Sequence, residues 1–389
     1  MKRNRRARVA VAALFLTNGA VFANLVPRLP ELKAELGLAN AEYGVVVAAF
    51  PAGALVAGLA AGHFIRRFTS ARVAVAGTLG IAVLVLVAGT SSTPAIVAAA
   101  LFAGGACDAL VDVSQNTHGL RVQRAYGRSI INSLHAVWSA GAVLGGLMGA
   151  AAIALHVSRT THLAVSAVVF SAVALGSLPF LLRGADAEPA HYATARDGRP
   201  GRAVYLALGA LVIIATAGAV VEDAGSSWAT LYLRDGLGAP GATAAFGYIA
   251  LLGFQFIGRL TGDRLVDRFG ERAVSRCGGL ITAAGMGFAL AVPSLPATIV
   301  GFAAAGIGIA TVVPAAMHAA DRLPGLRPGT GLTVVAWLMR VGFVCSPLIV
   351  GLIADMASLR AGLLVVPIAG IAVIAASGAL STRRPPTRS

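Results

Sequence analysis

The sequence predicts an all-α integral membrane protein, with twelve transmembrane helices in two pseudo-symmetric six-helix bundles. Composition, a series of apolar runs and a one-sided distribution of basic residues predict this fold. Hydrophobic residues make up 57% of the 389 residues and charged residues only 12%, and the mean hydropathy is +0.80. A water-soluble fold of this length cannot bury so much apolar surface. We therefore expect the chain to lie in a lipid bilayer.

Twelve apolar runs have the length that a membrane helix needs. A hydrocarbon core of about 30 Å is crossed by about 20 helical residues. The runs lie at about 9–27, 41–64, 73–90, 95–118, 129–152, 163–182, 203–232, 242–262, 274–292, 297–319, 330–353 and 361–380. The first run follows the basic residues Met1–Arg8 and resembles a signal peptide, but no clean small-residue cleavage site follows it. We interpret it as a retained helix.

Basic residues lie mainly on one side of these runs. The termini and the even-numbered loops carry 25 of the 31 lysines and arginines, the other loops carry five, and Arg340 lies within a span. Because basic loops stay in the cytoplasm, we expect a multi-pass protein of the cytoplasmic membrane with both termini inside. The net charge of +15 follows the loops, so we expect no nucleic-acid partner. The three cysteines lie in separate apolar runs and form no metal or disulfide pattern.

The two halves of the chain resemble each other. A polar segment at 183–202, rich in glycine, proline and charge, predicts a cytoplasmic linker between a bundle at 1–182 and a bundle at 203–389. Gly58-x₃-Gly62 recurs about 200 residues later as Gly258-x₃-Gly262, and His118 matches His318. This offset indicates an internal repeat.

A basic loop after the eighth run carries the most specific motif. It reads Gly262-Asp-Arg-Leu-Val-Asp267-Arg268-Phe-Gly270-Glu-Arg272. Together with the two six-helix halves, it resembles the loop signature of the major facilitator superfamily. The resemblance implies that this loop locks the cytoplasmic ends of helices in one of two alternating states. In the first-half copy, Arg66 replaces the acid and Thr69 replaces the glycine.

The fourth and fifth runs resemble one branch of that superfamily. Asp112-Val-Ser-Gln-Asn116 looks like the acid-x₃-Asn element of fucose-permease-like transporters, and His135-Ala-Val-Trp138-Ser is similar to an element of a related bacterial branch. The first run contains Asn18 and Asn24 where that pattern has an acid. A mechanism that depends on a first-helix acid is therefore not carried over.

The fourth run carries acids where a lipid-facing helix has none. Helical spacing places Gly104, Gly105, Asp108, Asp112, Gln115 and Gly119 in one stripe, with Asn116 at its margin. A carboxylate near the bilayer centre costs at least ~2.5–3.5 kcal/mol, so this stripe has to face a polar cavity or a partner. Asp112 and His135 each lie ~9 Å from the cytoplasmic ends of their helices, and Asp108 lies ~15 Å deep. An acid–imidazole pair at one depth holds or releases a proton; the alternative is a static hydrogen bond.

Further polar and aromatic residues lie in the second half. Arg340 is ~15 Å deep in the eleventh run and requires a carboxylate, backbone carbonyls or an anionic ligand. Glu222 is the expected protein partner if the seventh helix is broken near Gly218 or Gly225, and Asp223 is expected at the interface. The fifth, seventh and eleventh runs contain Trp138, Trp228 and Trp337, and in the major facilitator superfamily, which this chain resembles, these helices line the cavity. The three side chains either contact a ring-shaped substrate or serve as packing anchors.

These residues predict a transporter. The expected function is secondary active transport of a small polar organic molecule, such as a sugar or another metabolite, by proton symport with alternating access. Proton-antiport efflux of a drug or secondary metabolite is an alternative, suggested by Gly141-x₃-Gly145-Gly146-x₂-Gly149. A non-transporting membrane receptor or assembly protein on this fold is another. We expect a monomer with no enzymatic activity, cofactor or metal.

Overall fold

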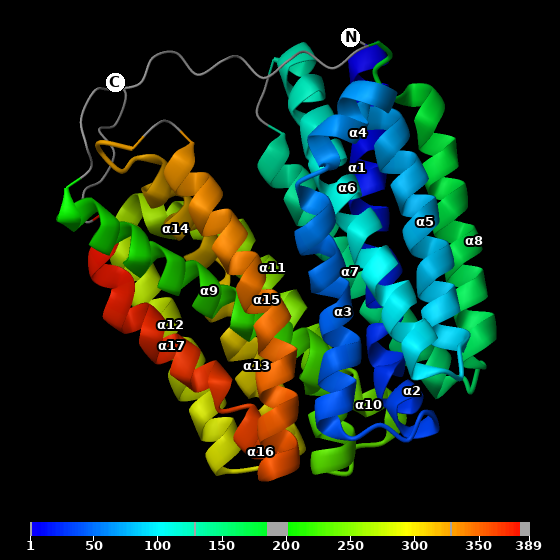
Figure 1. The fold of residues 1–389 in the computed structure, drawn as a ribbon, viewed down its shortest axis with the longest axis vertical. Helices are drawn as coiled ribbons and strands as arrows, with labels where there is room; N and C mark the ends of the chain where they lie inside the picture. Colours follow the sequence, from blue (N-terminus) through cyan, green and yellow to red (C-terminus); the bar gives the residue numbers. More distant parts are fainter. Residues whose placement is uncertain (1, 128–129, 185–200, 327–328, 382–389) are drawn as a thin grey trace. The chain divides into compact units, whose positions relative to one another are not determined.

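A computed structural model describes residues 2–127, 130–184, 201–326 and 329–381. Within these residues, twelve helical segments are long and apolar enough to cross a membrane, which confirms the all-α membrane fold (Figure 1). The predicted linker at 183–202 falls mostly on residues outside the described ranges. Its role as a domain boundary therefore stays a prediction.

The first six spans are built from α1 to α8. Their bounds are α1 (Lys2–Ala23), η1 (Val26–Arg28), α2 (Leu29–Glu35), α3 (Asn40–Gly58), α4 (Ala61–Phe68), α5 (Ser70–Thr90), α6 (Pro94–Tyr126), α7 (Ile131–Ala154), α8 (Arg159–Ser177) and η2 (Leu178–Phe180). The first span extends beyond the predicted 9–27 because η1 and α2 continue it. The predicted second span at 41–64 is divided between α3 and α4.

The remaining spans are built from α9 to α17. Their bounds are α9 (Arg202–Leu231), the π-helical turn η3 (Tyr232–Gly236), α10 (Gly241–Ala244), α11 (Phe246–Phe269), α12 (Glu271–Ala291), α13 (Leu295–Ile309), α14 (Val312–Asp321), α15 (Thr330–Met356), α16 (Leu359–Gly362), α17 (Val365–Ala376) and η4 (Ser377–Ala379). The tenth span is interrupted between α13 and α14. At this break, Gly258 and Gly262 of α11 leave room for the side chains of Ala310 and Thr311.

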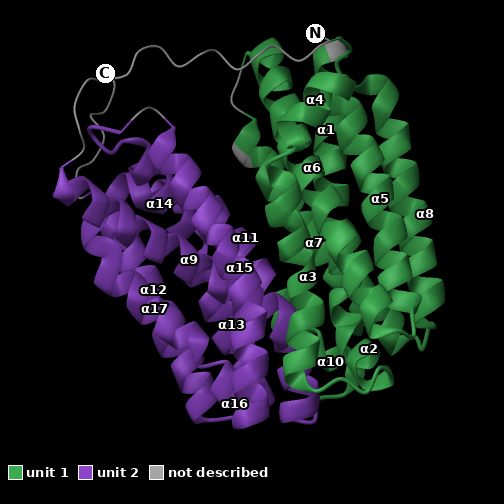
Figure 2. Ribbon diagram, in the orientation of Figure 1, with its two compact units in different colours: residues 1–188, 239–249 green, residues 189–238, 250–389 purple. Residues whose placement is uncertain are grey.

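The helices form two compact units. Unit 1 comprises residues 1–188 and 239–249, and unit 2 comprises residues 189–238 and 250–389 (Figure 2). The main part of unit 1 therefore contains the first six spans. The short helix α10 and the start of α11 are also grouped with unit 1.

Close backbone contacts recur in both units at an offset of about 200 residues. In unit 1, a Cβ atom on Gly105 of α6 would overlap the carbonyl oxygen of Phe50 in α3. In unit 2, a Cβ atom on Gly306 of α13 would overlap the carbonyl oxygen of Leu251 in α11. Glycine is required at both positions because only a helix surface without a side chain allows such an approach. The predicted repeat is therefore present in the helix packing.

A second pair of helices repeats in the same way. In unit 1, α7 packs on α1, where Gly141 contacts Leu16 and Gly145 contacts Ala20. In unit 2, α15 packs on α9 with Gly342 at Thr216 and Ser346 Oγ 3.5 Å from Val220 O. Both α15 contacts join residues 126 positions apart, so α9 and α15 run parallel in a fixed register.

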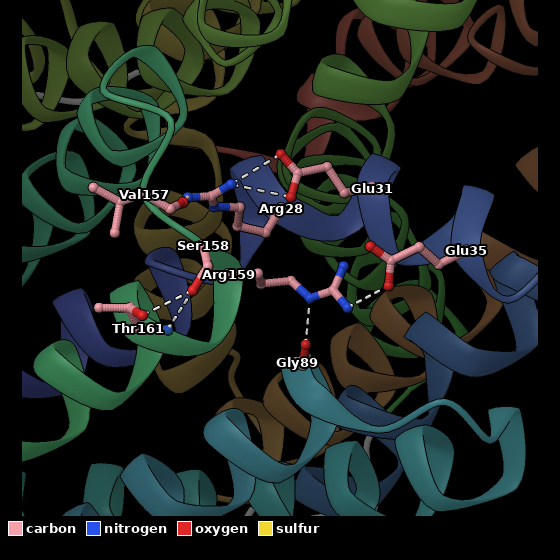
Figure 3. A network of polar contacts seen from close by, with 8 residues as sticks. All are labelled: Arg28, Glu31, Glu35, Gly89, Val157, Ser158, Arg159 and Thr161. Carbon is pink, nitrogen blue, oxygen red and sulfur yellow. Dashed lines mark hydrogen bonds and ion pairs between the residues drawn. The ribbon is translucent and has the colours of Figure 1, made fainter.

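Two arginines connect the loops at one end of unit 1 (Figure 3). Arg28 donates to Glu31 at 3.0 Å and to Val157 O at 2.7 Å, and it is only 4% exposed. Arg159 donates to Gly89 O and, at 2.5 Å, to Glu35 Oε2. Charge-assisted bonds of this kind are strong where water is partly excluded. They fix the α1–α2 connection against the start of α8.

The close contact at Gly306 yields a stability prediction. Gly306→Ala should lower the melting temperature of the purified protein, because the new methyl group would force α13 and α11 apart at a cost of ~1–3 kcal/mol. Gly253→Ala on α11 is the matched control, since a Cβ atom there has nothing within 4 Å. Thermal unfolding in detergent measures both, and equal melting temperatures would contradict this packing.

Candidate functional site

A chain of three polar side chains connects α6 and α7. The Asn116 side-chain amide donates to the backbone oxygen of Asp112 at 2.8 Å and to its carboxylate Oδ1 at 3.0 Å. The Asn116 Oδ1 atom lies 3.1 Å from His135 Nε2. The ring of Phe15 from α1 packs edge-on against the His135 ring, with centroids 5.4 Å apart. Asn116 thus lies between Asp112 and His135, which helical spacing in the sequence predicts at the same depth in the membrane.

The chemistry of these groups fixes the direction of the hydrogen bonds. A carboxylate only accepts hydrogen bonds, so the Asn116 nitrogen faces Asp112 and its oxygen faces His135. The His135 Nε2 atom must then carry a hydrogen, as it does in one neutral tautomer and in the cation. Asp112 is half-buried and His135 is exposed. Through Asn116, hydrogen bonds therefore link the half-buried carboxyl group of Asp112 to the exposed imidazole of His135.

The other residues of the predicted stripe have different surroundings. Gly104 and Gly105 are buried against Phe50 of α3, so this part of the stripe is a helix contact. Asp108 is half-buried one helical turn from Asp112. Gln115 is fully buried, and its two amide atoms have no hydrogen-bond partner within the described residues. On α7, Trp138 is half-buried and its backbone oxygen lies against Gly19 of α1.

A second polar group lies between α9 and α11 in unit 2. Gln255 Nε2 donates to Glu222 Oε2 at 2.7 Å, and Arg259 NH2 lies 3.6 Å from the same oxygen. Gln255 is 2% exposed. Gln255 and Arg259 are one helical turn apart on α11, so both reach the same carboxylate. The Glu222 charge is therefore held by an amide and a guanidinium.

Arg340 and Glu222 lie at different levels. The register of α15 on α9 places Arg340 beside residue 214, eight residues from Glu222, which corresponds to ~12 Å along the axis. Helix α9 also runs without a break past Gly218 and Gly225. Arg340 is half-buried.

The remaining aromatic and acidic residues of unit 2 differ in exposure. Trp228 is fully buried, whereas Trp337 is 44% exposed. Asp223, expected at the interface, is instead buried at 7% exposure. Its neighbour Ser227 donates to Asp223 Oδ1 at 3.2 Å.

The loop motif adopts the same backbone conformation in both halves. Gly270 precedes α12 with φ 82° and ψ 155°, and Thr69 precedes α5 with φ 76° and ψ 149°. Arg268 stacks over Phe269 at 5.3 Å, as Arg67 does over Phe68 at 5.8 Å. The histidine repeat is also part of this geometry. His118 Nδ1 lies 3.0 Å from Ser70 Oγ, and His318 Nδ1 lies 2.5 Å from Glu271 Oε1.

The two loops differ in their charges. Asp267 and Arg268 are exposed at the end of α11, and Arg66 and Arg67 are exposed at the end of α4. Arg272 has another role: its side chain donates to the backbone oxygens of Gly378 at 2.5 Å and Leu380 at 2.9 Å. It thereby fastens the end of the last span to α12. Gly262 lies against Thr311 at the break in the tenth span.

Comparison with known proteins identifies the family. The family model of the Major Facilitator Superfamily matches residues 11–265 and again residues 206–389. The chain belongs to the major facilitator superfamily. Relatives of similar length include an uncharacterized transporter, y4wD, of Sinorhizobium fredii, which is 30% identical over 352 residues and covers 90% of this chain and 92% of its own. Membrane protein MosC of Rhizobium meliloti is 29% identical over 372 residues, with 95% and 88% coverage.

Solved transporters of this superfamily share the fold. The nucleoside transporter NupG has a TM-score of 0.72 at 13% identity and covers 97% of this chain and 98% of its own. A bacterial homologue of the human lysosomal transporter Spinster has a TM-score of 0.74 at 14% identity, with 99% coverage of both chains. At this identity, the likeness concerns the arrangement of helices alone.

Sequence reasoning missed several residues of these polar groups. Gln255 is a single amide in an apolar run, one turn before an arginine, and this spacing was a usable signal. In the sequence, Arg259 is one of the basic residues near the loop after the eighth run, and nothing in its spacing indicated that it would pair with Glu222. His162 was also missed: its Nε2 lies 2.8 Å from Asn24 Oδ1, and both residues are buried. No spacing rule joins two positions 138 residues apart.

The conformation of Thr69 yields a second stability prediction. The backbone region of Thr69 is normally restricted to glycine and costs other residues ~1–3 kcal/mol. Thr69→Gly should therefore stabilise the protein by about 1 kcal/mol, since relief of strain exceeds the added entropy of the unfolded chain. The reverse change Gly270→Thr should destabilise it. Denaturant or thermal unfolding measures both variants, and a destabilised Thr69→Gly protein would refute the assigned conformation.

Proposed function

We propose that this protein is a secondary active transporter that moves a small polar organic molecule, of the sugar or metabolite type, by proton-coupled symport with alternating access. The Asp112–Asn116–His135 chain is the observation that supports proton coupling. It joins a carboxyl group to an imidazole across two spans, and both kinds of side chain can bind and release a proton. Alternating access would expose this chain to one side of the membrane at a time.

The sequence also supports a location, an oligomeric state and a set of substrate-binding residues. We place the protein in the cytoplasmic membrane as a monomer, with both termini and the 183–202 linker in the cytoplasm and bundles at 1–182 and 203–389. The acid-x₃-Asn element of α6 supports a place near the fucose-permease-like branch. Asp108, Trp138, Glu222, Trp228 and Arg340 are proposed to contact or orient the substrate. Arg340 would recognise an anionic or strongly polar group, because a guanidinium stays charged at mid-depth.

The structure gives no specific support to the efflux alternative. That alternative rested on the glycines of α7. Gly141 and Gly145 lie against Leu16 and Ala20 of α1, Gly149 lies against Asn24 and Pro27 just beyond the end of α1, and Gly146 lies against Tyr248 and Ile249 of α11. Close packing against neighbouring segments accounts for these glycines.

The substitution Asp112→Asn tests the proton step. It fixes the neutral form and keeps an oxygen for the Asn116 amide, so substrate binding and exchange should survive while uphill accumulation is lost. The measurement uses proteoliposomes with an imposed pH gradient and a panel of radiolabelled sugars and nucleosides. Uptake against a gradient and counterflow exchange are recorded for the same preparation.

Asp108→Asn is the matched control for this experiment. It removes a charge one turn away on the same helix, and it should weaken binding instead of uncoupling transport. Uphill, pH-driven uptake that persists in the Asp112→Asn protein would show that the proton is carried elsewhere or that no proton is used.

The loop motif is proposed to act asymmetrically. Asp267 lies at the end of α11, where a charge can bias one of two states, and the first loop has Arg66 in its place. Asp267→Asn should slow transport and move the population away from the outward-facing state, while Thr69→Gly should leave transport rates nearly unchanged. Labelling of introduced cysteines, on a background without the three native ones, reports the population. Equal shifts from both changes would rule the asymmetry out.

A further inference from the structure

The carboxyl group of Asp223 is enclosed between α9 and α15 in unit 2. It is 7% exposed. Ser227, one turn later on α9, donates to Oδ1 at 3.2 Å, and Ser346 of α15, whose hydroxyl donates to Val220 O at 3.5 Å, lies near the carboxyl group. The second oxygen, Oδ2, is buried and has no hydrogen-bond partner within the described residues. The two oxygens therefore have unequal surroundings.

The charged groups on the elements around Asp223 lie at other levels. Of the helices packed on α9, α13 and α17 carry no titratable side chain. On α15, Arg340 is level with residue 214, nine residues or ~13 Å from Asp223, and Asp355 is level with residue 229. On α14, His318 is paired with Glu271, and Asp321 ends the helix. In η3, Arg234 is paired with Asp235 at 3.4 Å.

The charged residue next to Asp223 in the chain has the same sign. Glu222 precedes Asp223 in the chain, and its own counter-ion is Arg259 at 3.6 Å on α11. Among the described residues Asp223 forms no ion pair, so an ionised carboxylate there would carry a large desolvation penalty, and the surrounding hydrocarbon offers no water to reduce it. A carboxylic acid avoids the cost because it is neutral.

We propose that Asp223 is a second proton-binding residue, held as a neutral acid with its proton on Oδ2. On binding, hydronium transfers a proton to Oδ2, so an O–H bond of hydronium breaks, an O–H bond forms at Oδ2, and water remains. On release, that bond breaks and the proton returns to water, with no change of redox state. Ser227 donates to Oδ1 and stabilises the ionised form during release. The inference deepens the proposed transport function by placing one protonatable acid in each unit.

Infrared spectroscopy detects a protonated Asp223 carboxyl group without any transport assay. The full-length protein, reconstituted in phosphatidylcholine vesicles at neutral pH, should show a protonated-carboxyl band that moves on labelling with carboxyl-¹³C aspartate. The intensity of the band should fall in Asp223→Asn, and a component at another frequency should appear in Asp223→Glu. Asp267→Asn is the matched control, because that aspartate is exposed and its loss should leave the band unchanged.

The outcomes separate this inference from the proposed function. A band of unchanged intensity in Asp223→Asn, or a wild-type protein with no aspartate-dependent band, overturns the inference and leaves the role of Asp112 untouched. Thermal stabilisation by sodium over choline, lost in Asp223→Asn, would also overturn it, since the site would then hold a metal cation. If Asp223→Asn does not fold, the labelled wild type and the displaced band of Asp223→Glu decide the question.

Discussion

The hydrocarbon core offers no hydrogen-bond partner, and this constraint governs where the polar groups of the protein lie. Each acid within a span must be held by a neighbouring helix or reach a water-filled space. Asn116 and His135 accompany Asp112, Gln255 and Arg259 accompany Glu222, and Ser227 accompanies Asp223. Glycines make these arrangements possible because they let helix backbones touch, as Gly105 does on α3 and Gly342 on α9.

The internal repeat distinguishes residues that maintain the fold from residues that we propose for transport. Close contacts, the positive φ before α5 and α12, and the arginine–phenylalanine stacks occur in both halves. The acids do not repeat: Asp112 lies in the fourth span of one unit, and Glu222 with Asp223 lies in the first span of the other. Features shared by the halves therefore serve the fold, and we infer that the unshared acids serve transport.

The sequence predicted the twelve spans and the repeat because both depend on patterns that recur over 20 or 200 residues. It placed Asp112 and His135 at one depth because helical rise is constant. It did not predict Asn116 as the bridge, Arg259 as the partner of Glu222 or the burial of Asp223. These contacts depend on how each helix is rotated about its axis, which composition does not define. Backbone strain at Thr69 was suggested only by its alignment with Gly270.

Proton symport makes substrate movement and proton movement one process. Proteoliposomes that contain a pH-sensitive dye test it directly when members of a metabolite panel are added outside in the absence of any imposed gradient. Under symport, a transported compound should acidify the lumen of protein-containing vesicles and have no effect on empty ones. Substrate entry with no pH change, or with an alkaline lumen, would contradict symport.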